Sequence, residues 1–129
     1  MKTRHVIGLS MLAGVALGAI VVQGLHAQAK PPVYYVGDIS DVTDPEGYKA
    51  VGGRSAASAA ALLKDFGGHY ISRTDSITAL DGTAPKRFII IRFDSVEKAK
   101  GWYNSAEMKK VNEIRMKTTK SRSFIVEGM

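Results

Sequence analysis

Arg115 has the most informative position of any charged residue in this sequence. It lies seven residues after Met108, on the same face of a predicted helix as Val111, so its guanidinium is expected to point toward the interior. A buried guanidinium needs a partner. Two kinds of partner fit the sequence. One is an internal carboxylate, Asp38 or Glu127, in which case Arg115 has a structural role; the other is the carboxylate of a bound ligand.

Aromatic residues could complete a binding cleft with Arg115. A cleft lined by Tyr35, Tyr48, Trp102 and Tyr103 and closed by Arg115 would suit a small aromatic or carboxylated molecule. The same side chains, at the same spacings, also suit a hydrophobic core.

His69 is the only histidine outside the N-terminal leader and is a further candidate contact of this cleft. It follows Gly67-Gly68 at the start of a predicted strand, where it could equally bond a backbone group. One histidine and no cysteine cannot build the usual transition-metal sites, so no metal is expected. The sequence has no nucleotide-binding fingerprint and no serine-histidine-acid set, so we expect no cofactor and assign no catalytic residue.

The N-terminus has the three parts of a signal peptide. A basic stretch at Met1–His5 precedes an apolar run over residues 6–22, and Ala27-Gln28-Ala29 matches a cleavage site. Cleavage after Ala29 predicts a periplasmic or secreted protein whose single domain is residues 30–129. The alternative is an uncleaved leader that anchors the protein in a membrane. A net charge of +6 spread over 129 residues gives no reason to expect nucleic acid as a partner.

The helices and strands that must position these residues are predicted from the hydrophobic pattern and from the residues that begin and end each element. Asp44-Pro45 begins a first helix that Gly67-Gly68 ends, and Gly52-Gly53 allows a kink or a later start near Arg54. Asn104-Ser105 divides a second helical region. Strands are predicted at residues 33–39, 69–73, 87–93 and 123–127, and helices at 44–66 and 95–120. This order predicts an α+β fold, the ferredoxin-like βαββαβ plait.

The third strand predicts a partner subunit. Ile89, Ile90 and Ile91 are consecutive, so both faces of this strand are apolar. The helices can cover only one face of the sheet. A second copy of the chain is the natural cover for the other face, which predicts a homodimer.

Several short motifs, in this order and spacing, resemble one bacterial family. They are Asp44-Pro45-Glu46-Gly47-Tyr48, Gly67-Gly68-His69-Tyr70, Asp81-Gly82, Arg87 to Phe93, Ala99 to Ser105, Arg115 and Val126-Glu127-Gly128. The pattern is similar to the family called domain of unknown function 1330. The resemblance implies a protomer of the dimeric α/β-barrel superfamily, in which two four-stranded sheets pair face to face, and implies no activity. The sequence has Val51 and Met108 where the family commonly has tyrosine.

Two functions of different class fit these residues. The first is an exported homodimer that binds a small organic ligand in a sheet-helix cleft. The second is a cofactor-independent oxidoreductase or isomerase acting in the same cleft, by analogy with the superfamily. Such an enzyme would need an acid-base group there, which could come from His69, Glu107 or Asp38.

Overall fold

The structure is a computed structural model that describes residues 30–52 and 56–129. The predicted leader, residues 1–29, and the predicted kink near Arg54 lie outside the described residues. Among the helices of the two described ranges, none is long and apolar enough to cross a membrane.

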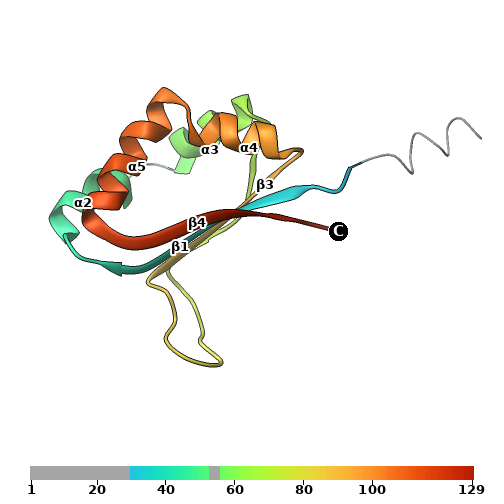
Figure 1. Cartoon of the computed structure of the whole chain (residues 1–129). Helices are drawn as coiled ribbons and strands as arrows, with labels where there is room; N and C mark the ends of the chain where they lie inside the picture. Colours follow the sequence, from blue (N-terminus) through green and yellow to red (C-terminus); the bar gives the residue numbers. More distant parts are fainter. Residues whose placement is uncertain (1–29, 53–55) are drawn as a thin grey trace, which may run out of the picture. The chain divides into compact units, whose positions relative to one another are not determined.

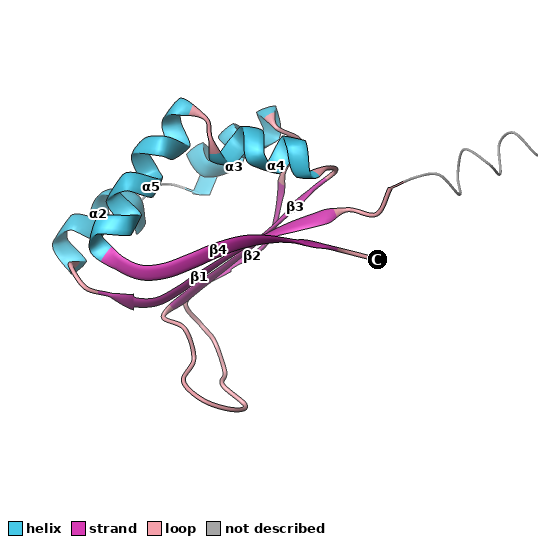
Figure 2. Cartoon of the chain, in the orientation of Figure 1, coloured by secondary structure: helices cyan, strands magenta, loops and turns pink. Residues whose placement is uncertain are grey.

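Four antiparallel strands form one sheet, in the spatial order β2-β3-β1-β4. The strands are β1 (Val33–Val42), β2 (His69–Thr74), β3 (Arg87–Phe93) and β4 (Thr119–Glu127). Between them lie the helices α2 (Pro45–Gly52), α3 (Ala56–Asp65), α4 (Val96–Tyr103) and α5 (Ala106–Thr118). The helices cover one face of the sheet (Figure 1), and Figure 2 shows the same two layers by type of element. The predicted ferredoxin-like plait is confirmed.

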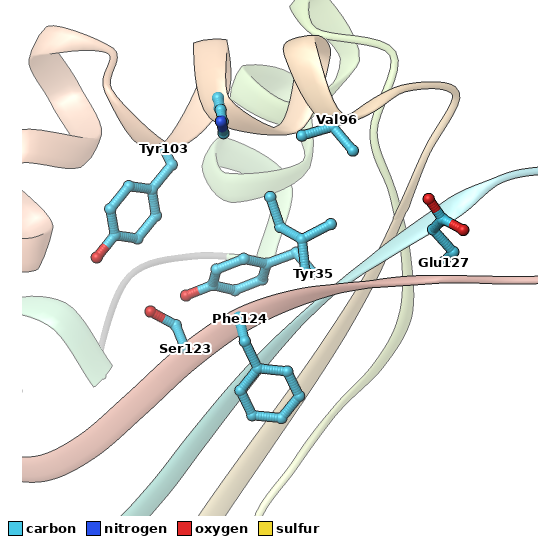
Figure 3. Close-up of a pocket in the computed structure, with 8 residues that line it drawn as sticks. Tyr35, Val96, Tyr103, Ser123, Phe124 and Glu127 are labelled. Atoms are coloured by element: carbon cyan, nitrogen blue, oxygen red, sulfur yellow. The ribbon is translucent and has the colours of Figure 1, made fainter.

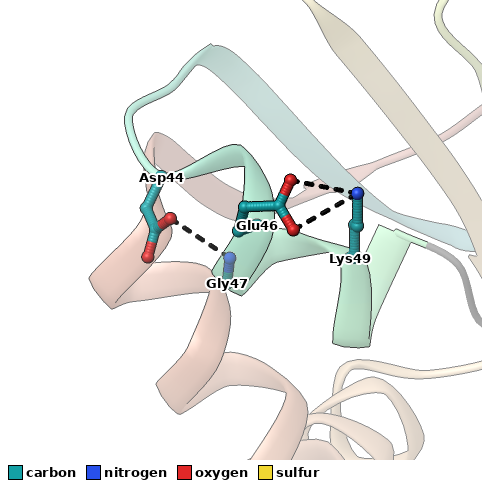
Figure 4. A network of polar contacts seen from close by, with 4 residues as sticks. All are labelled: Asp44, Glu46, Gly47 and Lys49. Carbon is teal, nitrogen blue, oxygen red and sulfur yellow. Dashed lines mark hydrogen bonds and ion pairs between the residues drawn. The ribbon is translucent and has the colours of Figure 1, made fainter.

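The first helical region begins where the sequence predicts. The backbone N–H of Gly47 donates to Oδ1 of Asp44 at 3.1 Å, so Asp44 caps the helix that starts at Pro45 (Figure 4). Glu46 and Lys49, one turn apart, form an exposed ion pair at 3.0 Å that contributes little to stability.

Two glycines end this region. Gly67 has φ +70, the left-handed conformation in which a side chain is strained, and its N–H donates to the Lys64 carbonyl. At Gly68 the requirement is space, because an added Cβ would lie 2.7 Å from Cε1 of Phe93. Gly67 is therefore required by its backbone conformation, and Gly68 by the close approach of β2 to the core.

The second helical region divides as predicted, but it ends earlier. Ser105 caps α5 by accepting from the backbone N–H of Met108 at 3.3 Å. The helix stops at Thr118 and not at Lys120, since Thr119 already has extended backbone angles, φ −138 and ψ 160. As a result, β4 begins at Thr119, four residues before the predicted strand, and follows α5 with no linker.

The hydrophobic core lies between the sheet and the helices. Strands β1 and β3 present alternate residues to the helical layer, and each of these pairs with a neighbour that points the same way, as Val33 does with Phe93 and Tyr35 with Ile91. The buried core includes Val33, Tyr35, Ile91 and Phe93 from the sheet and Leu62, Leu63, Ala99, Trp102 and Met108 from the helices.

The other face of the sheet, which we call the open face, has no helix over it. Ile90 lies here, between Val36 on β1 and Ser72 on β2, whereas Ile89 and Ile91 face the helices. The main side chains of the open face are Tyr34, Val36, Asp38, Phe88, Ile90, Arg92, Arg122, Phe124 and Val126. Phe124 and Val126 are exposed, and Ile90 is half-buried. The predicted apolar character of both faces of the third strand is present in the protomer.

Asp38 is the acidic residue within this open face. Its Oδ2 accepts from Nε of Arg122 at 3.1 Å. Its Oδ1 is buried and has no hydrogen-bond partner in the part of the chain that the structure describes. A buried carboxylate oxygen without a donor is costly, so the pairing of Oδ2 with Arg122 offsets only part of the cost of burying this carboxylate.

Candidate functional site

Two hollows lie between the helical layer and the sheet. The larger one, which we call the outer pocket, has a volume of about 400 Å3 and lies between α4 and β4 (Figure 3). Its lining residues are Tyr35, Val96, Lys100, Tyr103, Ser123, Phe124, Ile125 and Glu127. This volume is within the usual range for a small organic ligand.

Three hydroxyl groups make one end of the outer pocket polar. In Figure 3 the oxygens of Tyr35, Tyr103 and Ser123 turn toward the same end of the pocket. Burial raises the pKa of Tyr35 above 10.0, while the hydrogen bond with Ser123 and the positive charge of Arg115 act in the opposite direction. Tyr35 is therefore a neutral hydroxyl at physiological pH.

The smaller hollow, which we call the inner cavity, has a volume of about 60 Å3 and lies deeper, under α2 and α5. Its lining combines aromatic, apolar and basic residues: Tyr35, Ile39, Tyr48, Val51, Tyr70, Arg73, Arg87, Ile89, Ile91, Trp102, Met108, Val111, Asn112 and Arg115. Tyr35 separates the two hollows, because it lines both.

Arg115 points inward, as predicted, and is 9% exposed. Its guanidinium donates to three neutral groups: the Ser121 hydroxyl at 2.6 Å, the Tyr103 hydroxyl at 3.3 Å and the Asn112 amide oxygen at 3.4 Å. The predicted pairing with an internal carboxylate is wrong for both candidates. Asp38 lies on the open face and pairs with Arg122, and Glu127 is exposed at the end of β4.

Two further arginines that the sequence analysis missed line the inner cavity with Arg115. Arg73 on β2 pairs with Ile89, and Arg87 lies two residues before Ile89 on β3, so the two are diagonal neighbours on the helix-facing side. Among the residues that the structure describes, none of those that line the cavity is acidic. The inner cavity therefore concentrates positive charge.

An irregularity in β2 is the reason that Arg73 faces inward. The register with β3 shifts between Tyr70 and Ser72, so Ile71 has no partner of its own. In a regular strand Ser72 would face the helices, as Tyr70 does, and Arg73 would face the open side. The bulge reverses this order, so Arg73 faces the helices and Ser72 does not. A bulge leaves no mark in hydrophobic alternation, so the alternation alone does not place Arg73 on the inward side.

The structure divides the residues predicted to form one cleft. Tyr48, Trp102 and Arg115 line the inner cavity, Tyr103 lines the outer pocket, and Tyr35 lines both. Trp102 is also a core residue, in edge contact with Tyr35 at 4.9 Å between ring centroids. His69 lines neither hollow, because it is exposed and pairs with Arg92 on the side of the open face.

The three candidate acid-base groups also lie away from both hollows. Glu107 is exposed in the first turn of α5, and Asp38 and His69 are on the open-face side of the sheet. Their expected position near a cleft is wrong. Across residues 30–52 and 56–129, no three His, Cys, Asp or Glu residues gather as a group that could hold a metal ion.

A protein-family model described as "Domain of unknown function (DUF1330)" matches residues 32–129. The chain belongs to this family. DUF1330 thus covers all of the described elements, from β1 to β4, and includes both hollows and the open face.

Solved structures show the same fold in distant proteins. The RPA0582 protein of unknown function from Rhodopseudomonas palustris has a TM-score of 0.56 at 15% identity, over 84% of this chain and 92% of that one. A dimeric ferredoxin-like protein of unknown function from Thermobifida fusca has a TM-score of 0.57 at 8% identity, over 77% and 92%. SnoaB, a cofactor-independent oxygenase from Streptomyces nogalater, has a TM-score of 0.52 at 12% identity, over 77% and 94%. No curated protein matches this DUF1330 chain.

Proposed function

We propose that this protein is an exported homodimer that binds a small aromatic carboxylate in the outer pocket. The ring would lie against Val96, Ile125 and the tyrosine faces, and the carboxylate would face the polar end of the pocket.

The observation that carries this proposal is the contact between Arg115 and Tyr103. The guanidinium donates to the Tyr103 oxygen, so the proton of that hydroxyl can be donated to another group. Tyr103 lines the outer pocket, so the positive charge of Arg115 acts there indirectly, by polarising the O–H group of Tyr103 as a hydrogen-bond donor. Such a donor suits an anionic oxygen better than a neutral one.

The acid-base groups that the sequence offers for catalysis, Asp38, Glu107 and His69, do not line the outer pocket. The alternative, a cofactor-independent oxidoreductase or isomerase, draws on neighbours such as SnoaB, with which this chain shares the fold alone. Its acid-base group would have to be one of the tyrosines, or Lys100 or Glu127 at the outer pocket, since Asp38, Glu107 and His69 lie elsewhere. A tyrosine whose pKa is raised is a poor general base.

Arg115→Met tests the proposal. We expect the free energy of unfolding to stay equal or to rise, because the variant removes a buried charge that no carboxylate compensates. We also expect benzoate to raise the melting temperature of the wild-type protein and to lose this effect in the variant. Tyr103→Phe should weaken benzoate binding by about tenfold or more, since one hydrogen bond to a charged group is lost.

Thermal melts and calorimetric titration with benzoate would measure both effects, with Lys109→Met on the exposed side of α5 as the control. Equal benzoate binding by the wild type, Arg115→Met and Tyr103→Phe would rule out the outer pocket as the site. A loss of about 3 kcal/mol or more in Arg115→Met, with no benzoate effect in any variant, would make Arg115 purely structural.

The open face supports the homodimer part of the proposal. Its exposed Phe124 and Val126 continue the apolar surface of Ile90, and a large apolar patch on a small domain usually marks an interface. The neighbour from Thermobifida fusca, described as dimeric, has the same arrangement of strands and helices.

Export is proposed from the leader. If signal peptidase cleaves after Ala29, intact-mass measurement of the protein isolated from its native envelope should give a chain that begins at Lys30. Retention of residues 1–29 would instead indicate a membrane-tethered form.

A further inference from the structure

The inner cavity carries a charge imbalance that the proposed ligand of the outer pocket does not neutralise. Arg73, Arg87 and Arg115 all line this cavity, and no acidic residue in the described ranges does. None of the three forms an ion pair with any described residue. Arg115 is buried and Arg73 and Arg87 are half-buried, so an anion that entered the cavity would be attracted by three positive charges and would reduce their mutual repulsion.

We propose that the inner cavity is a second binding site, for a compact doubly charged oxyanion of the phosphate type. The volume of about 60 Å3 sets the size of the bound group, because one water molecule occupies about 30 Å3 of liquid. An aromatic carboxylate is too large for this space, whereas a group of one central atom with its oxygens is of the right order.

The polar groups around the cavity match such an anion. Guanidinium groups present paired N–H donors to oxyanions, and they reach the cavity from two directions: Arg73 and Arg87 from the sheet, and Arg115 from α5. Tyr48, Tyr70 and Asn112 also line the cavity and carry a hydroxyl or an amide group.

The basic groups are also held in place. The Arg73 guanidinium lies over the Tyr70 ring at 5.5 Å from its centroid, and Arg115 is fixed by its bonds to Ser121, Tyr103 and Asn112. The bulge at Ile71 places Arg73 on this side of the sheet. Bulges are over-represented beside binding and active sites, where they re-aim a side chain, and here the re-aimed side chain is a cation.

Titration of the purified protein with inorganic phosphate, followed by calorimetry and thermal melting, tests this site. We expect saturable binding of phosphate and sulfate, and binding of nitrate at least about tenfold weaker because it carries a single charge. Arg73→Gln and Arg87→Gln should each weaken phosphate binding by about tenfold or more, since each removes a charge-assisted contact. Benzoate binding at the outer pocket should be unchanged in both variants.

Lys110→Gln is the matched control, because Lys110 is an exposed basic residue of α5 that lines neither hollow. Phenyl phosphate distinguishes two sources of the anion. If phenyl phosphate binds as well as inorganic phosphate, the cavity accepts the head group of a larger ligand. If phenyl phosphate does not bind, the cavity accepts only the free ion. Failure of phosphate to bind, or equal binding by the wild type and the Arg73 and Arg87 variants, would overturn the proposal. Failure of benzoate alone would overturn only the outer-pocket function.

Discussion

Ile90→Lys is expected to convert the protein into a folded monomer. In the protomer the side chain of residue 90 is half-buried on the open face, so a lysine there can extend its ammonium to water. In a two-fold interface the same substitution buries two ammonium groups, each at a cost of several kcal/mol. The dimer dissociation constant should therefore rise by more than about a thousandfold, which sedimentation velocity over a concentration series would measure.

The matched control is Met116→Lys. Met116 is 70% exposed on α5, on the other side of the molecule from the open face, so its replacement should leave the dimer intact. A wild-type protein that sediments as a monomer at micromolar concentration would contradict the prediction, as would an Ile90→Lys variant that dimerises like the wild type.

Phe93→Ala is expected to cost about 3–5 kcal/mol of the free energy of unfolding, a large share of the stability of a domain this size. Phe93 is 0% exposed and contacts Trp102, with 5.6 Å between the ring centroids. It also lies against the space at Gly68 where no side chain fits. Removing the ring leaves a cavity that the tight Gly68 corner cannot collapse to fill.

Urea unfolding followed by tryptophan fluorescence would measure this loss, because Trp102 is the only tryptophan of the chain. Leu80→Ala is the control: Leu80 is 93% exposed in the segment between β2 and β3, so its truncation should change the unfolding midpoint little. A Phe93→Ala loss below about 1 kcal/mol would mean that the core repacks around the gap.

Most of the fold could be predicted from sequence because its boundaries are set locally. Asp44 caps a helix through its own side chain, Gly67 ends one through its own backbone, and Ser105 restarts one in the same way. Such signals need only a few neighbouring residues. The error at the end of α5 has the same origin, since nothing near Thr119 in the sequence marks the direct passage from helix to strand.

The candidate site could be predicted only in part because its contacts depend on register. Helical periodicity alone predicts that Arg115 faces inward, and it does. The identity of its partners depends on which side of β4 Ser121 faces and on how the break after Tyr103, the last residue of α4, sets α4 against α5. Asp38 was a plausible partner until the strand pairing placed it on the opposite face of the sheet.

Arg122 has a consequence for how selective the open face is. An apolar surface by itself adheres to almost any other apolar surface, which in a crowded compartment leads to non-specific aggregation. The Arg122 side chain is 76% exposed, and its Nε donates to Asp38 while the rest of its guanidinium faces water. A covering surface that brings no acceptor to these N–H groups loses about 1–3 kcal/mol or more of hydrogen bonding to water. Surfaces that are only apolar, or shifted by one strand, therefore bind less well than one with an acceptor in the right place. Arg122 would thus discriminate between correct association and misassembly.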